Sequence, residues 1–185
     1  MAQGSGIIGF TQWLQSPAGR YLLAWEQQHL DGAVADLFGF HALQLGLPEL
    51  DSLRANRMPH HWVATESNTP EADPEALPRA AVALHCDFDA LPFDSHSLDL
   101  VVLPHALELA RDPHLALREV ERVLVPEGRV VIVGFDAIPE ARRAIADGKI
   151  FADVVQQPRL IGRQTIEAIA GYLAGEPVAA QLLIP

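Results

Sequence analysis

The fold is decided by the stretch SLDLVVLPHALELARDPHLALREVERVLVPEGRVVIVGF, residues 97–135. It begins with a nearly continuous apolar run, residues 97–104, which is typical of a strand buried on both faces of a parallel sheet. It ends with a second apolar run, RVVIVGF at residues 129–135, which predicts another strand. The residues between the two runs determine how these strands are connected.

Those intervening residues carry the signals of a helix. Asp112 followed by Pro113 provides an N-cap residue and a proline at the first helical position. Apolar side chains then recur at helical spacing, at Leu117, Val120, Val123 and Leu124. The stretch PEG, residues 126–128, is expected to end the helix. A strand, a helix and a strand in this order predict parallel strands joined by a right-handed crossover.

Further helices are predicted on both sides of this unit. Ser16 and Pro17 resemble a second N-cap with its proline, and they predict a helix that runs to about His29. The stretch HALQLGL, residues 41–47, predicts a short helix stopped by Pro48. Two later helices are predicted at residues 139–148 and 159–174.

Short apolar runs predict the remaining strands, at residues 32–38 (GAVADLF), 61–65 (in HHWVAT), 81–86 (AVALHC) and 149–155 (KIFADVV). The terminal run at residues 179–185 fits either a strand or a tail, and the acidic, proline-rich residues 67–78 predict a loop. The alternation predicts one α/β domain over residues 1–185. It is Rossmann-like and doubly wound, with a mainly parallel sheet of about six strands ordered roughly 3-2-1-4-5-6 and helices on both faces.

Composition narrows the classes of function. The chain has 185 residues, 49% of them hydrophobic, which suits one globular domain with a real core. Its net charge of -11 argues against binding to nucleic acid or to an anionic membrane. Cys86 is the single cysteine, so no disulfide forms within the chain. With neither a secretion signal nor a membrane-length apolar run, a cytoplasmic protein is expected.

The pieces DFDALPF, SLDLVV, HALEL and VLVPEGR follow one another in order within residues 86–135. This arrangement resembles the middle of a class I S-adenosylmethionine-dependent methyltransferase, of the methyltransferase-11 kind. Such enzymes position an already reactive sulfonium, so the resemblance implies no universal catalytic residue. It does imply cofactor contacts, at Asp36, Gly39, Glu66, Asp87, Phe88 and His105.

The resemblance gives these residues different roles. Asp36 would end the first strand, Glu66 would hold the ribose hydroxyls, and Asp87 with Phe88 would flank the adenine. His105, after the fourth strand, would line the site of methyl transfer. The residues alone also allow simpler roles: Asp36 as a helix cap, Glu66 as a solvated charge, and Asp87 with Phe88 as a turn and a core aromatic.

The sequence departs from the family at the glycine loop. The family pattern after the first strand is D-x-G-x-G-x-G, whereas DLFGFHA places Phe38, Phe40 and Ala42 at the three glycine positions. Glycine there permits positive φ and close approach of the backbone to the cofactor. We therefore expect no bound cofactor, with S-adenosylmethionine as the one that the resemblance would admit. No metal is expected either, because His60, His61 and His105 lack partners at ligand spacing.

Residues 134–178 resemble a different family. The pieces GFD, IADGK, VVQQP and YLAGEPV are similar to the C-terminal part of ribose-type periplasmic sugar-binding proteins. The resemblance implies that Asp136 and Gln156 hydrogen-bond sugar hydroxyls. A second lobe that would enclose the sugar has no counterpart here, so sugar binding is not expected.

The two resemblances meet without a linker inside RVVIVGFDAIPEARRAIADG, residues 129–148. We therefore hypothesise an engineered chimera, with residues 1–134 from a methyltransferase and residues 135–185 from a sugar-binding protein. Its expected role is a scaffold without catalysis, and the alternative is residual binding of S-adenosylmethionine or S-adenosylhomocysteine. An exposed sheet edge is expected to favour a homodimer.

Overall fold

The computed structural model describes residues 10–67 and 80–134, together with nine positions between 163 and 177. Its elements, in chain order, are α1 (Phe10–Leu14), α2 (Pro17–Val34), β1 (His41–Leu45), β2 (His60–Thr65), β3 (Leu84–His85), β4 (Leu98–Pro104), α3 (Ala106–Leu109), α4 (Pro113–Val123) and β5 (Leu124–Val133).

Several predictions concern residues outside those described. They are the helix at 139–148, the strand at 149–155, the terminal run at 179–185, most of the loop at 67–78, and the sugar contacts Asp136 and Gln156. The described positions between 163 and 177 include helical ones, such as Ile166 and Ile169, within the last predicted helix.

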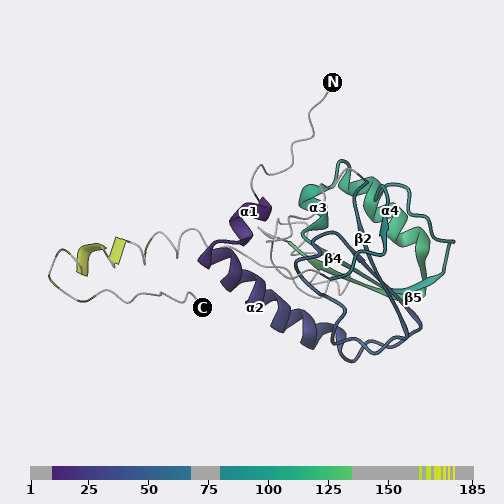
Figure 1. Ribbon diagram of the computed structural model, residues 1–185, viewed down its shortest axis with the longest axis horizontal. Coiled ribbons are helices and arrows are strands. Elements are labelled where there is room, and N and C mark those ends of the chain that lie inside the picture. The colour runs from purple at the N-terminus through teal and green to yellow at the C-terminus, as the bar shows by residue number, and fades with distance from the viewer. Residues whose placement is uncertain are drawn as a thin grey trace, which may run out of the picture.

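The five strands form one parallel sheet in the order β3-β2-β1-β4-β5. In β1, Leu43 is paired with Trp62 of β2 on one side and with Val101 of β4 on the other. Helix α2 lies on one side of the sheet, and α3 and α4 lie on the other (Figure 1). This architecture confirms the α/β, doubly wound fold and the predicted order of the first five strands.

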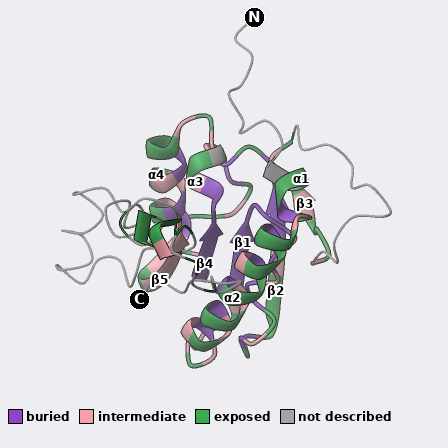
Figure 2. Cartoon of the chain, turned by 90° about the vertical axis from the view of Figure 1, so that its left-hand side faces the viewer, coloured by how far each residue is buried: buried purple, intermediate pink, exposed green. Residues whose placement is uncertain are grey.

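β4 is the apolar centre of the domain, as its continuous hydrophobic run predicts (Figure 2). Leu100 and Val102 pack on the α2 side with Leu30 and Val34, while Val101 and Leu103 pack on the opposite side. There they meet the buried face of α4, which consists of Ala116, Val120 and Val123. The sheet is therefore covered on both faces.

The prediction of the first strand at residues 32–38 is wrong. Helix α2 does not end near His29 but continues to Val34, because Leu23, Leu30 and Val34 keep one helical face buried in the core. The first strand is instead β1, within the stretch HALQLGL that was predicted to be a helix. β1 pairs with strands on both sides, and this pairing overrides local propensity.

The predicted caps are confirmed. Ser16 Oγ accepts a hydrogen bond from Gly19 N, and Asp112 Oδ1 accepts bonds from the backbone N–H groups of His114 and Leu115. Helix α4 ends at Val123, before the PEG stretch that was predicted to stop it. The reason is that Leu124 is already extended and pairs with β4, so residues 126–128 lie in an irregular part of β5. In the described part of the chain, no helix combines the length and apolarity needed to cross a membrane.

Candidate functional site

The carboxyl ends of the parallel strands place the polar turns of the chain along one edge of the sheet. Glu66 follows β2, the segment Cys86–Asp89 follows β3, and His105 follows β4. Gly46 follows β1 at the same edge. This edge is where ligands bind in open α/β sheets, so it is the candidate site.

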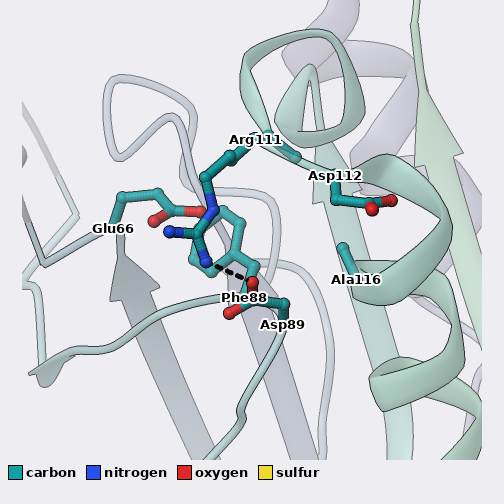
Figure 3. Close-up of a pocket in the computed structure, with 7 residues that line it drawn as sticks. Glu66, Phe88, Asp89, Arg111, Asp112 and Ala116 are labelled. Carbon is teal, nitrogen blue, oxygen red and sulfur yellow. Dashed lines mark hydrogen bonds and ion pairs between the residues drawn. The ribbon is translucent and has the colours of Figure 1, made fainter. Parts of the chain in front are cut away.

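A small pocket lies at this edge, beside the amino end of α4. Its cavity volume is about 10 Å³, and its lining residues are Glu66, Phe88, Asp89, Ala110, Arg111, Asp112 and Ala116. The Arg111 side chain points toward Asp89, and Glu66 and Phe88 belong to the same lining (Figure 3). Arg111 forms an ion pair with Asp89. Two residues of the lining are therefore paired with each other.

Carboxylates give this pocket an acidic character. Burial raises the pKa of the Glu66 carboxyl, and the nearby charges of Asp87 and Asp89 raise it further, against a hydrogen bond from the Phe88 backbone. Burial also raises the pKa of the Cys86 thiol to about 11, with Glu66 and Asp87 acting in the same direction. At neutral pH this thiol is protonated, so it is not an activated nucleophile.

His105 lies at the carboxyl end of β4, as predicted, but its side chain is buried. Its Nε2 is 2.9 Å from Glu26 Oε1 of α2, and its Nδ1 is 3.3 Å from Glu108 Oε1. Burial opposes protonation of the ring, but hydrogen bonds to Glu108 and Glu26 outweigh it and raise the pKa of His105 to about 9. The ring is therefore a charged link between α2 and the β4–α3 turn, and it does not line the pocket described above.

With β1 at residues 41–45, the stretch after the first strand is GLPELDS, residues 46–52, and not DLFGFHA. In this register Gln44 stands where the family pattern has an acidic residue, and Gly46 keeps the first glycine. Pro48 and Leu50 stand at the second and third glycine positions. Gly46 has a φ of +81°, which explains why glycine is kept there.

The side chain of Gln44 points into this loop and is completely buried. Its Nε2 donates to the carbonyl oxygens of Gly46, Leu47 and Leu50 at 3.0, 3.1 and 2.8 Å. Its Oε1 accepts from the backbone N–H of Ser52 at 2.9 Å. One amide thus closes the loop onto itself from both ends.

Other N–H groups of the loop are also bonded within the protein. Gly46 N donates to the Ala64 carbonyl at 2.8 Å, and Leu50 N donates to the Leu47 carbonyl at 3.0 Å. Asp51 N donates to Gln27 Oε1 of α2 at 3.0 Å. Pro48 has no N–H to offer. A phosphate- or carboxylate-binding loop needs free N–H groups, and these residues do not supply them.

The placement predicted for Asp36 is wrong. It lies in the turn between α2 and β1, at the amino edge of the sheet, because the helix and not a strand precedes it. Gly39 lies at the same edge, where a Cβ would come within 2.4 Å of Asp99 Cβ. Asp99 Oδ2 accepts hydrogen bonds from the backbone N–H groups of Phe40 and His41. The need for glycine at residue 39 is therefore explained by packing.

The structure does bring together Glu66, Asp87 and Phe88, as predicted. Phe88 is buried, whereas Asp87 is exposed beside it. Sequence reasoning missed Arg111, which nothing in its local pattern singles out. It also missed Gln44, although a lone amide in an apolar run was a usable signal. Among the described residues, no group of His, Cys, Asp and Glu is arranged to hold a metal ion.

The loop at the end of β1 has only the first glycine of the family's cofactor-binding pattern. The loop is closed by Gln44, whose amide bonds the backbone of Gly46, Leu47, Leu50 and Ser52. The pocket near Phe88 has a cavity volume of only about 10 Å³, about the space of one water molecule, whereas typical ligand pockets measure roughly 300–1,000 Å³.

Residues 56–132 match the protein family described as methyltransferase domain. The protein YafS of Escherichia coli K12 is 34% identical over 131 residues, which cover 68% of this chain and 48% of that protein. The ribose import binding protein RbsB of Haemophilus influenzae is 34% identical over 73 residues, which cover 40% of this chain and 25% of RbsB. The chain thus spans about half the length of YafS.

A solved complex between the Haloferax volcanii Trm112 methyltransferase activator and a methyltransferase contains a chain that matches with a TM-score of 0.48. The two are 26% identical, over 69% of this chain and 59% of that one. The family match makes residues 56–132 a methyltransferase-like region, and it begins after the closed loop that follows β1.

Proposed function

We propose that this chain is a composite α/β scaffold that does not catalyse methyl transfer. In this proposal it was engineered by joining a methyltransferase fragment, residues 1–134, to a sugar-binding-protein fragment, residues 135–185. The closed loop after β1 supports the proposal of no catalysis, because Gln44 bonds the backbone groups of the loop within the protein. Partial matches to YafS and to RbsB support a composite origin.

A second candidate function is residual binding of S-adenosylmethionine or S-adenosylhomocysteine. It is supported by Glu66 and Phe88, which line one pocket at the carboxyl edge, and by Asp87 beside them. Against it stands Arg111, which lines the same pocket and is paired with Asp89 (Figure 3). Binding there would have to displace the ion pair between Arg111 and Asp89.

Isothermal titration with S-adenosylhomocysteine separates the two candidates. The scaffold proposal expects no saturable heat in the micromolar range. Saturable binding would overturn it and favour the second candidate. In that event Phe88→Ala should abolish the heat, while Phe38→Ala, which changes an aromatic side chain that is 77% exposed at the other edge, should leave it unchanged.

Sugar binding is tested separately, because Asp136 and Gln156 lie outside the described residues. RbsB is named a ribose import binding protein, and this chain corresponds to only 25% of its length. A site made from that part alone would enclose little of a sugar. The proposal therefore expects ribose to leave the melting temperature unchanged, and a saturable rise would contradict it.

We also propose that the chain does not bind nucleic acid or membranes and that a sheet edge favours self-association. The net charge of -11 repels polyanions. In the described sheet, β3 and β5 are the edge strands, and exposed edges pair with other chains. Light scattering should show a dimer at high protein concentration, and a monomer throughout would refute this part.

A further inference from the structure

Gln44 differs from the other polar residues at the centre of the domain, because three carbonyl oxygens converge on its side-chain nitrogen. The carbonyls of Gly46, Leu47 and Leu50 lie 3.0, 3.1 and 2.8 Å from its Nε2. A carboxamide supplies N–H donors to these oxygens and a carbonyl acceptor to Ser52 N. A hydroxyl or an aliphatic side chain could not satisfy both ends of the loop.

A carboxylate at residue 44 is incompatible with this geometry. An ionised carboxylate only accepts hydrogen bonds, so one of its oxygens would face the three carbonyl oxygens without an intervening proton. The position is 0% exposed, so the charge would also be buried without a cation. The closed form of residues 46–52 therefore depends on the neutral amide.

The backbone of this loop needs such support. Gly46 and Leu47 both have positive φ, +81° and +35°, and the second value is unfavourable for leucine. The Leu47 side chain is buried in the core on the α2 side, as are Leu50 and Leu53. Burial of these side chains and the bonds to Gln44 hold the strained turn in place, so the loop turns its apolar groups inward.

A second amide fastens the same loop to α2. Gln27 Nε2 donates to the Asp51 carbonyl at 2.9 Å, while its Oε1 accepts from Asp51 N at 3.0 Å. On the other side, Ala80 N donates to the Pro48 carbonyl at 2.7 Å. The loop is thus held by α2, by β1 and by the segment that leads to β3.

We infer that Gln44 keeps residues 46–52 closed on themselves and that this closure denies the end of β1 to a cofactor such as S-adenosylmethionine. The inference rests on the proposed function and deepens it, because it attributes the absence of a cofactor site to one side chain, that of Gln44. The fold itself is intact around the loop, with β1 paired on both sides. The side chain at residue 44 therefore determines whether the loop of residues 46–52 is closed or open.

Hydrogen exchange of the full chain tests this inference. The variants are Gln44→Glu, which sets a carboxylate against the carbonyls, and Gln44→Leu, which removes the hydrogen bonds without adding charge. Both should lower protection of the Leu50 and Ser52 amides by about 100-fold or more, since those amides lose their closed-loop environment. The amides of Val101 and Leu103 in β4 should keep their protection.

Gln28→Glu is the matched control, because it makes the same chemical change at an exposed position of α2. Its exchange pattern should equal that of the parent chain. If Gln44→Glu does not fold, Gln44→Leu decides the question alone. Unchanged protection at Leu50 and Ser52 in Gln44→Leu, or an equal loss at Val101 and Leu103, would overturn the inference.

This experiment can fail independently of the proposed function. Binding of S-adenosylhomocysteine by the parent chain would refute the scaffold proposal. If Leu50 and Ser52 stayed protected with the ligand bound, Gln44 would still close the loop, but the closure would not exclude the ligand, and that half of the inference would be overturned. Conversely, the parent chain could bind no ligand while the loop amides keep their protection in the Gln44 variants. That result would refute only the role of residue 44.

Discussion

At the scale of single residues, His105 joins parts of the chain that are distant in sequence. Its ring connects Glu26 in α2 with Glu108 in α3, and both the ring and the Glu26 side chain are almost fully buried. Breaking a buried pair by removing one partner is costly, because the remaining charge stays buried. The docking of α2 on this part of the domain therefore depends on a proton at His105.

The proton on His105 predicts a loss of stability at high pH. Hydrogen bonds to Glu108 and Glu26 outweigh burial and raise its pKa from 6.5 to about 9 in the folded state. The stabilisation is complete below about pH 6.5 and disappears as the pH rises through 9. It amounts to about 3 kcal/mol. Urea unfolding measured at pH 6 and at pH 10 checks this. The free energy of unfolding should fall more between the two pH values in the parent chain than in His105→Gln.

His105→Gln is the appropriate reference because every other titrating group, including Cys86, is common to both proteins. The variant should be less stable at pH 6, and the difference between the two proteins should shrink by pH 10. Equal pH dependence in the two proteins would mean that His105 is neutral in the folded state.

Asp112 is the best-defined cap in the domain, and its removal should be measurable. Its Oδ1 accepts from two backbone N–H groups at the start of α4, at 3.0 and 3.1 Å. Asp112→Ala should lower the free energy of unfolding by about 1 kcal/mol in urea titrations. Asp36→Ala, at an exposed turn, should change it by less than about 0.5 kcal/mol. Similar losses in both variants would deny Asp112 a capping role.

At the scale of elements, the sequence predicted β4, β2 and α4 well because their signals are local and consistent. β4 is a long apolar run, and α4 has both a cap and a periodic buried face. The α2–β1 region was misassigned because GAVADLF is apolar like a strand, although Val34 within it belongs to the buried face of a helix. Only the pairing of β1 with two neighbours resolves the ambiguity.

The same misassignment limited what the sequence could predict of the candidate site. Glu66, Asp87 and Phe88 were placed correctly because they follow strands that were correctly assigned. Asp36 and Gly39 were not, since their roles depended on a strand that does not exist. The bonds of Gln44 to backbone carbonyls depend on the path of the loop, which no residue pattern specifies.

Shortening a buried side chain of β4 should lower the free energy of unfolding more than shortening an exposed side chain of a helix. Leu100 is 0% exposed and packs against α2 and the loop after β1. Leu100→Ala should lower the free energy of unfolding by about 2–5 kcal/mol because it leaves a cavity. Leu115→Ala, at a position that is 41% exposed in α4, should lower it by less than about 1 kcal/mol. Comparable losses would mean that the core is not centred on β4.

At the scale of the whole molecule, residues 10–134 contain two apolar clusters that cover both faces of one sheet. A sheet covered on both faces has the layers that a folded domain requires. The proposed junction at residue 134 thus lies after a unit that has its own core. The folding of residues 1–134 can therefore be tested without residues 135–185.

A fragment of residues 1–134 should therefore unfold cooperatively by itself. We expect one thermal transition whose midpoint does not depend on the spectroscopic probe, as for other small domains. The full chain serves as the reference for both the midpoint and the steepness. A broad transition without a defined midpoint in the fragment would mean that later residues complete the core, and the proposed division at residue 134 would be wrong.

Because Cys86 is buried, the reactivity of its thiol reports how often the domain opens. The thiol is only 8% exposed, and its raised pKa of about 11 keeps it protonated at pH 8. An aromatic disulfide reagent can then react only when the apolar cluster around Cys86, which includes Phe88 and Leu91, opens. Since the chain has no other cysteine, the rate of colour formation in the native protein reports how often that cluster opens.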